Sequence, residues 1–221
     1  MSQVENNRKF DLLITGVGGQ GAILASDIIG KSAVAAGLPI RAAETHGMAQ
    51  RGGSVVNHIR IGEDLGSMIP KKGADLMLAL EPMETVRYVE FLKDGEVIIV
   101  NTQPVIPVTV TSGLAKYPDV SEILDVLSEK YIVKAFNADE LAFEAGSRLA
   151  MNVVMVGAVS GYLPIPKETL LESIKALVPQ KTIEVNMRAF EMGRRKVEGE
   201  LSFFYLLLWM YEGLPAGAYA I

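Results

Sequence analysis

Cysteine is absent from the 221-residue sequence. Without a thiol the chain can form no disulfide, no thiolate nucleophile and no cysteine-ligated iron–sulfur cluster. Histidine is nearly as scarce, with two residues. His46 and His58 are not spaced as metal ligands and the carboxylates around them are scattered, so the sequence predicts no metal site.

Positive charge is also limited, since the net charge is −5 and the pI is near 5.2. No long basic run is present, which argues against nucleic-acid binding. The first nine residues are polar and carry no apolar segment of the kind that directs secretion, so we expect a cytoplasmic protein. The longest aromatic-rich stretch, 201–211, is shorter than the roughly 20 residues that a helix needs to cross a bilayer, and we expect no membrane contact.

Several catalytic signatures are missing as well. No Gly-x-Ser-x-Gly elbow occurs, and no serine has an obvious histidine partner. A thiamine-diphosphate signature needs Gly-Asp-Gly, but the nearest match, 93–95, begins with lysine, and no Asn-Asn pair follows. We therefore predict no catalytic residue in this chain and no cofactor bound by it alone. Apolar residues nevertheless make up 49% of the sequence, with a mean hydropathy of +0.26, which indicates a lasting partner.

The feature that organises the chain is the glycine-rich run at 16–21, Gly-Val-Gly-Gly-Gln-Gly. An apolar run of strand length, 10–15, precedes it, and residues 22–36 carry apolar residues at helical spacing. Such a turn lets a backbone approach a ligand closely, and it opens at a helix N-terminus, where an anion such as a phosphate is favoured. A turn needed only for close packing remains the alternative.

A second polar segment follows the next expected strand, 38–43. Glu44 lies about where a dinucleotide-binding fold keeps its ribose-binding acid, so a nicotinamide or flavin oxidoreductase is one interpretation. That pattern, however, has no use for the glycine-dense loop 45–54, which offers an imidazole, an amide and a guanidinium. Because such loops follow strand ends in open α/β sheets, we expect this one to lie beside the glycine turn.

The rest of the chain alternates strands with helices, which predicts one Rossmann-like, doubly wound, mostly parallel α/β sheet flanked by helices, with further helices at the C-terminus. Asn101 ends one strand on the ligand side of the sheet, whereas 104–111 indicates an edge strand or a loop. His58 and Asn152 are interpreted as structural groups. We expect strands at 55–61, 74–80, 96–100 and 131–136, and helices at 83–92, 119–130, 137–145, 149–162, 167–177 and 182–198.

Two runs carry a family resemblance, the glycine turn at 16–21 and Glu-Thr-His-Gly-Met-Ala-Gln-Arg-Gly-Gly at 44–53. Together they resemble the gamma-type domain of the 2-oxoacid:ferredoxin oxidoreductases. Within that family, positions 46–53 are most similar to the indolepyruvate branch. The resemblance continues at 79–82, 100–102, 152–158 and 186–191, and it covers about residues 10–198. We accordingly divide the chain into a gamma-type domain, 1–198, and an apolar tail, 199–221, that packs on the domain or on a partner.

The resemblance implies a subunit of a complex that oxidatively decarboxylates indolepyruvate or another 2-oxoacid, reduces ferredoxin and transfers the acyl group to coenzyme A as co-substrate. It also implies that thiamine diphosphate and the iron–sulfur clusters belong to a partner alpha subunit. A purely structural scaffold is the remaining alternative. The residues expected to meet the bound group or partner are Gly16, Gly18, Gly19, Gln20, Gly21, Glu44, His46, Gln50, Arg51, Gly52, Gly53 and Asn101.

Overall fold

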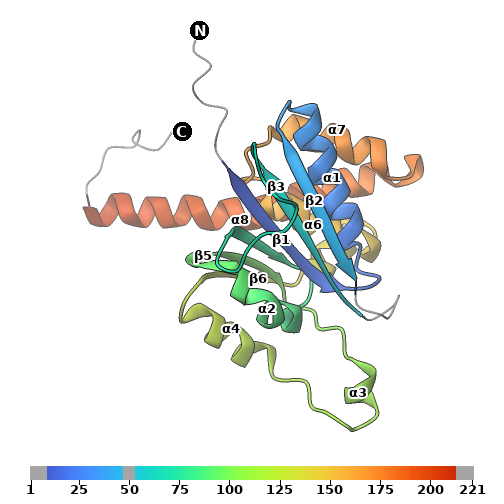
Figure 1. The fold of residues 1–221 in the computed structure, drawn as a ribbon, viewed down its shortest axis with the longest axis vertical. Coiled ribbons are helices and arrows are strands. Elements are labelled where there is room, and N and C mark those ends of the chain that lie inside the picture. Colours follow the sequence, from blue (N-terminus) through green and yellow to red (C-terminus); the bar gives the residue numbers. More distant parts are fainter. Residues whose placement is uncertain (1–8, 47–52, 213–221) are drawn as a thin grey trace.

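The computed structural model describes residues 9–46 and 53–212, and it describes side chains in these ranges except those of His46 and 200–212. One six-stranded sheet forms the centre, with strand order β2-β3-β1-β4-β5-β6 (Figure 1). Strands β1, β4, β5 and β6 are parallel, β3 is antiparallel to β1, and β2 is antiparallel to β3. Five strands therefore run in one direction. The strands are β1 (Phe10–Val17), β2 (Ile40–His46), β3 (Ser54–Ile61), β4 (Ala74–Ala79), β5 (Leu92–Asn101) and β6 (Ile132–Phe136).

Helices cover both faces of this sheet, as the mostly parallel, doubly wound prediction requires. The central strands are apolar on both sides: in β1, Leu12, Leu13 and Ile14 are all fully buried. Leu12 and Ile14 belong to one core cluster and Leu13 to the other. The first face carries α1 (Ala22–Ala35), α5 (Ala138–Ala145), α6 (Met151–Val159), α7 (Lys167–Leu177) and α8 (Ile183–Glu212), and the second carries α2 (Pro82–Tyr88) and α4 (Val120–Ser128).

Helices α6 and α8 cross at a distance that only glycine permits. A Cβ on Gly157 would lie 2.0 Å from the Phe190 carbonyl oxygen, and one on Gly193 would lie 1.8 Å from that of Val154. This crossing fixes the C-terminal layer against the sheet. The helix expected to end at 198 continues as one helix to Glu212 (Figure 1). The assignment of the tail to a partner surface stays a prediction.

Two local expectations are corrected. The stretch 104–111, expected to be an edge strand or a loop, forms no strand. Residues 104–107 are a loop, and the second half is the single helical turn α3 (Val108–Thr111), in which the Pro107 carbonyl accepts hydrogen bonds from the N–H groups of Val110 and Thr111. Short 3₁₀ turns, η1 (Val89–Phe91), η2 (Arg148–Ala150) and η3 (Gln180–Thr182), also replace parts of the expected helices.

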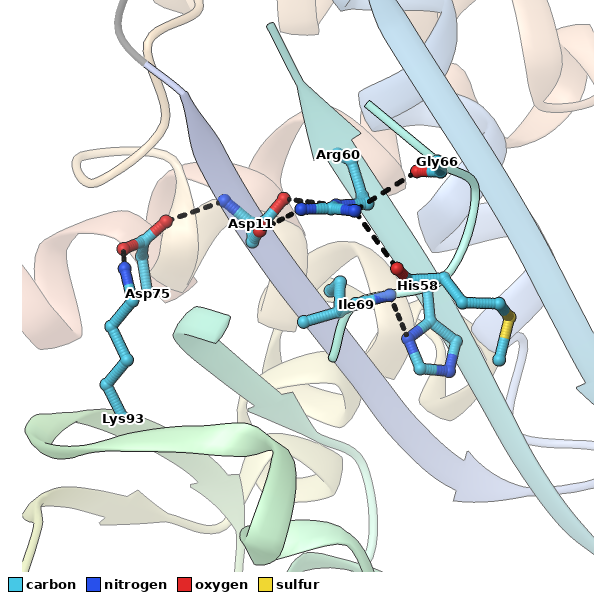
Figure 2. Close-up of polar contacts among 8 residues, drawn as sticks. Asp11, His58, Arg60, Gly66, Ile69, Asp75 and Lys93 are labelled. Carbon is cyan, nitrogen blue, oxygen red and sulfur yellow. Dashed lines mark hydrogen bonds and ion pairs between the residues drawn. The ribbon is translucent and has the colours of Figure 1, made fainter. Parts of the chain in front are cut away.

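The edge of the sheet where β1 begins, here the amino-end edge, is closed by ion pairs across four neighbouring strands (Figure 2). The Arg60 guanidinium donates from Nε and Nη2 to the two carboxylate oxygens of Asp11 at 2.8 and 2.9 Å. The backbone N–H of Asp11 donates to Asp75, whose other oxygen is paired with Lys93. Arg60 also donates to the carbonyls of Gly66 and Met68, which holds the loop after β3.

His58 lies beneath that loop and is a structural group, as the sequence predicted. It is 1% exposed, its Nδ1 accepts a hydrogen bond from the Ile69 N–H at 3.2 Å, and its ring meets Phe91 edge to face. Burial, followed by the charge of Arg60, lowers its pKa.

Candidate functional site

The glycine turn and the end of the polar loop meet at the opposite edge of the sheet, here the carboxyl-end edge. Val17, at the end of β1, pairs with Ser54, and His46, at the end of β2, pairs with Val55. The Gly18 N–H donates to the Gly53 carbonyl oxygen at 2.8 Å. The two segments that the sequence singled out are therefore joined by a backbone hydrogen bond.

Gln20 braces this turn from within. Its Oε1 accepts from the Val17 N–H at 2.9 Å, and its Nε2 donates to the Leu80 carbonyl at 2.9 Å. The side chain thereby ties the end of β1 to the end of β4. Gln20 therefore shapes the turn through both ends of its amide, and its contact with a ligand stays a prediction.

Two of the turn's glycines lie against packed side chains. A Cβ on Gly16 would lie 3.1 Å from the Leu80 Cβ. Gly21 has φ +79° and a Cβ there would lie 2.4 Å from Asn152 Nδ2, which donates to the Gly21 carbonyl at 3.1 Å. Asn152 is 4% exposed, which agrees with its expected structural role. Close packing accounts for the glycine at position 21 and contributes at position 16, and contact of either residue with a ligand stays a prediction.

Gly19 differs from them. It is exposed, its φ is +105°, and a Cβ built on it would find nothing within 4 Å. The first turn of α1 follows directly, and Gly21 provides its N-cap without a side-chain hydrogen bond. Backbone N–H groups at such a helix start favour an anion. The part of the turn that faces open space is therefore Gly19, shortly before the start of α1.

Glu44 is exposed on β2 and does not lie next to the glycine turn's strand. It pairs with Asn57 on β3, which pairs in turn with Ile14 on β1. In a dinucleotide-binding fold the strand bearing the ribose acid is the direct neighbour of β1. The antiparallel β3 takes that place here, and this geometry argues against the nicotinamide interpretation.

Asn101 closes the end of β5 from inside the protein. It is fully buried, its Nδ2 donates to the Leu80 carbonyl and to Asp139, and its Oδ1 accepts from the N–H groups of Gln103 and Ala138. These bonds link β4, β5 and the start of α5. Of the other expected site residues, Gln50, Arg51, Gly52 and the side chain of His46 lie outside the described part of the chain.

Sequence reasoning missed two buried carboxylates at the same edge, Glu81 and Glu84, which are 1% and 4% exposed. Glu81 caps α2: its Oε2 accepts from the Glu84 N–H at 3.0 Å. A usable signal was present, because an acid directly before Pro82, with a second acid three residues on, has capping-box spacing.

Glu84 reaches the base of the polar loop. Its carboxylate accepts from the Ser54 hydroxyl, which also lies 2.8 Å from the Tyr88 hydroxyl, and Arg87 is 3.5 Å away. Burial raises the pKa of Glu84, against the lowering effects of Ser54 and Arg87. Ser54 directly follows Gly53, so this contact fixes the point where the loop rejoins the sheet.

The described part of the chain offers neither a metal site nor a membrane span. Within it, no group of three or more His, Asp or Glu side chains is placed to hold a metal ion. None of its helices is long and apolar enough to cross a bilayer.

Comparison with protein families gives one match over most of the chain. Residues 11–196 match the family described as pyruvate ferredoxin/flavodoxin oxidoreductase. The indolepyruvate oxidoreductase subunit IorB of Thermococcus kodakarensis is 45% identical over 192 residues, which are 84% of this chain and 95% of that protein. The subunit of the same name from Archaeoglobus fulgidus is 46% identical over 188 residues, 84% of this chain and 94% of that one. The 2-oxoglutarate synthase subunit KorC of Methanothermobacter marburgensis is 28% identical over 195 residues, with coverages of 86% and 98%.

Solved structures share the fold. The gamma subunit of a keto/oxoacid ferredoxin oxidoreductase from Geobacter sulfurreducens superposes with a TM-score of 0.64 at 25% identity, over 86% of this chain and 99% of that one. The 2-oxoglutarate:ferredoxin oxidoreductase of Magnetococcus marinus, solved with 2-oxoglutarate, coenzyme A and succinyl-CoA bound, gives a TM-score of 0.67 at 19% identity, over 87% of this chain and 32% of that longer chain.

Proposed function

The chain belongs to the pyruvate ferredoxin/flavodoxin oxidoreductase family, and on that basis we propose that it is a subunit of an indolepyruvate ferredoxin oxidoreductase. The complex oxidatively decarboxylates indolepyruvate or a related aryl pyruvate, passes two electrons to ferredoxin and forms the aryl-acetyl-CoA. This chain is more similar in sequence to the two IorB subunits than to the 2-oxoglutarate synthase subunit, which supports indolepyruvate as the substrate over other 2-oxoacids.

In the proposed complex this chain positions bound groups and holds no iron–sulfur cluster. It has no cysteine to ligate a cluster, and thiamine diphosphate and the iron–sulfur clusters are assigned to the partner alpha subunit. When bound there, thiamine diphosphate supplies the stabilisation of the carbanion that decarboxylation leaves. The residues described at the carboxyl-end edge hold the glycine turn and the base of the polar loop in place, and none of them forms a nucleophile–base pair.

The observation that carries the proposal is the Gly18-to-Gly53 hydrogen bond. It places the two motifs that define the resemblance on one edge of the sheet, beside the start of α1. In the proposed complex this edge faces the cofactor-bearing subunit, and Arg51 neutralises an anionic group, either the substrate carboxylate or a coenzyme A phosphate. His46 and Gln50 set the orientation of that group.

The test uses the complex purified through a tag on this chain. Indolepyruvate- and coenzyme-A-dependent reduction of ferredoxin is measured, with pyruvate and 2-oxoglutarate as competing substrates. We expect indolepyruvate to have the highest kcat/KM, and a preference for either competitor would contradict the assigned substrate.

Arg51→Ala tests the role of the loop. We expect assembly to persist and kcat/KM to fall by about 100-fold, because a misplaced anionic group loses its reactive geometry. The matched control is Arg41→Ala, which removes an exposed arginine near the other end of β2 and should leave the kinetics unchanged. Unchanged kinetics for Arg51→Ala would remove this residue from the site.

A further inference from the structure

An excursion of the chain between β5 and α4 stands off from the rest of the protein. We call residues 105–117 the arm; it contains the helical turn α3, which Figure 1 shows well away from the sheet and its helices. Almost every residue of the arm is exposed. The exposed residues include large apolar side chains, and Val108 and Leu114 are 78% and 83% exposed.

The composition of the arm is unlike that of an ordinary surface loop. In a chain that is 21% charged, no residue from Thr102 to Ala115 carries a charge, and the first charged residues that follow are Lys116 and Asp119. Depletion of charge around exposed apolar side chains, with charges at the margin, is typical of the centre of a protein–protein interface. The uncharged part of the arm, 105–115, would expose this apolar surface without compensation if it were left permanently in water.

The arm is also held in one shape before any partner binds. Its turn is closed by its own backbone, since the Ser112 N–H donates to the Val108 carbonyl and the Leu114 N–H to the Thr109 carbonyl, both at 2.9 Å. Pro107 restricts the backbone where α3 begins. Little conformational entropy is then left to lose when the arm is covered.

One buried carboxylate fastens both ends of the arm. Oε1 of Glu81 accepts from the Val105 N–H at 3.2 Å and from the Tyr117 hydroxyl at 2.5 Å. Burial and the adjacent carboxylate raise the pKa of Tyr117, so this hydroxyl keeps the proton that it donates. Oε2 of the same carboxylate caps α2 at the edge that carries the glycine turn. The arm is thus fastened to the carboxyl-end edge of the sheet.

We propose that the arm is a docking element that inserts its uncharged apolar tip, centred on Val108 and Leu114, into an apolar surface of the thiamine-diphosphate-bearing subunit of the same complex. The proposal rests on the proposed function, because it takes its partner from that complex. The arm begins at the carboxyl-end edge, which also carries the glycine turn. A subunit that binds the arm therefore lies near the glycine turn, and this favours the thiamine-diphosphate-bearing subunit as the partner. Glu81 and Tyr117 are positioning residues that fix the direction of the arm.

The experiment measures association of the tagged chain with the thiamine-diphosphate-bearing subunit, using the dissociation constant and co-elution on a sizing column. We expect Val108→Asp and Leu114→Asp each to raise the dissociation constant at least about tenfold, because a carboxylate at the centre of an interface loses its hydration. Both side chains are exposed, so thermal unfolding of the isolated chain should not change. The matched control, Val126→Asp, alters a 63% exposed valine on α4 and should bind as wild type.

A second variant separates docking from folding. Tyr117→Phe keeps the ring and removes the hydroxyl bonded to Glu81, so the arm stays present but is held less firmly. We expect a rise of about threefold to tenfold in the dissociation constant, smaller than that for the tip variants. Val108→Ile, which keeps an apolar side chain at the tip, should bind as wild type. That result, beside weak binding by Val108→Asp, would show that the partner contacts the apolar side chain and not only the backbone.

Three results would overturn the proposal: wild-type binding by both tip variants, normal assembly with lost turnover, or a homodimer of this chain that the tip variants dissociate while the heterocomplex is unaffected. Failure of the proposed function is seen separately, in the wild-type complex. If that complex oxidises a different 2-oxoacid while the tip variants still fail to assemble, docking stands and only the substrate is wrong.

Discussion

The two edges of the sheet use carboxylates in opposite ways. At the amino-end edge, Asp11 and Asp75 are paired with the cations Arg60 and Lys93. At the carboxyl-end edge, Glu81 accepts hydrogen bonds only from neutral donors among the contacts described for it: a hydroxyl and two backbone N–H groups. The carboxylates at the amino-end edge are therefore neutralised by cations, whereas Glu81 is held by neutral donors and Glu84, beside it, has both a hydroxyl donor and the more distant Arg87.

The two edges also differ in the segments that their polar groups hold in place. The ion pairs of the amino-end edge satisfy one another, and they hold the loop after β3 in place. At the carboxyl-end edge, Gln20 braces the glycine turn, the contact of Ser54 with Glu84 fixes the base of the polar loop, and Glu81 holds the arm. Binding residues commonly sit on loops fixed by a rigid scaffold, and this edge provides that scaffold.

The largest effect on stability is expected from Arg60→Ala at the amino-end edge. The side chains of Arg60 and Asp11 are 13% and 9% exposed, so removing the guanidinium leaves a mostly buried carboxylate without its cation and close to Asp75. We expect the free energy of unfolding to fall by about 3–5 kcal/mol in urea titrations. Assembly and turnover of the folded fraction should stay normal, since this edge lies opposite the proposed site.

Two controls sharpen this result. Lys71→Ala breaks an ion pair whose side chains are 68% and 51% exposed, and it should cost no more than about 0.5 kcal/mol. The double variant Arg60→Ala/Asp11→Ala should lose less unfolding free energy than the sum of the two single variants. Each single variant leaves one charge of the pair without its partner, whereas the double variant leaves none. If the two single losses simply added, Arg60 and Asp11 would have no interaction energy, and their ion pair would not stabilise this edge.

Much of the fold follows from local pattern. Continuous apolar runs identified β1 and β4, because strands covered on both faces need no polar side. Asn137 caps α5 by accepting from the Glu140 N–H, as its spacing predicted. The strand order was not readable, since nothing in Ser54–Ile61 tells whether that strand runs with or against β1. Its antiparallel insertion is what moved Glu44 away from the glycine turn.

The arrangement of the candidate site was predictable from the sequence, but the contacts of its side chains within the protein were not. The sequence located the turn and the loop on one edge, and the Gly18-to-Gly53 bond agrees. The sequence did not show that the Gln20 and Asn101 amides both donate to the Leu80 carbonyl, and contact of these two residues with a ligand stays a prediction. The burial of Glu81 and Glu84 was not predicted, because glutamates are mostly exposed in folded proteins and only the packing of surrounding elements buries these two.

An intermediate effect is expected from Ser54→Ala at the carboxyl-end edge. This change leaves the buried Glu84 carboxylate without its hydroxyl donor, and we expect the free energy of unfolding to fall by about 1–3 kcal/mol. Because Ser54 anchors the loop that contains Arg51, turnover of the assembled complex should fall as well, unlike in Arg60→Ala. Ser128→Ala, an exposed serine on α4, is the control, with a change within about 0.5 kcal/mol. Equal turnover in both serine variants would place the loop outside the site.

The smallest effect is a pH dependence that differs in sign between two buried groups. In the unfolded chain His58 takes up a proton near its ordinary pKa of 6.5, while burial holds the folded pKa lower. The unfolded state then binds more protons, so stability falls as the pH falls below 6.5, by at most about 1.4 kcal/mol per pH unit.

Glu84 acts in the other direction. Its folded pKa lies above the ordinary value of 4.5, so the stability it contributes at lower pH is lost as the pH rises through that raised pKa. Urea unfolding at a series of pH values should show that His58→Asn, which keeps an acceptor for the Ile69 N–H, flattens the acid side of the profile, whereas Glu84→Gln flattens the fall above pH 4.5. If either variant changed the limb assigned to the other, the two edges would be coupled electrostatically, and the contrast between a neutralised edge and a neutral-donor edge would be lost.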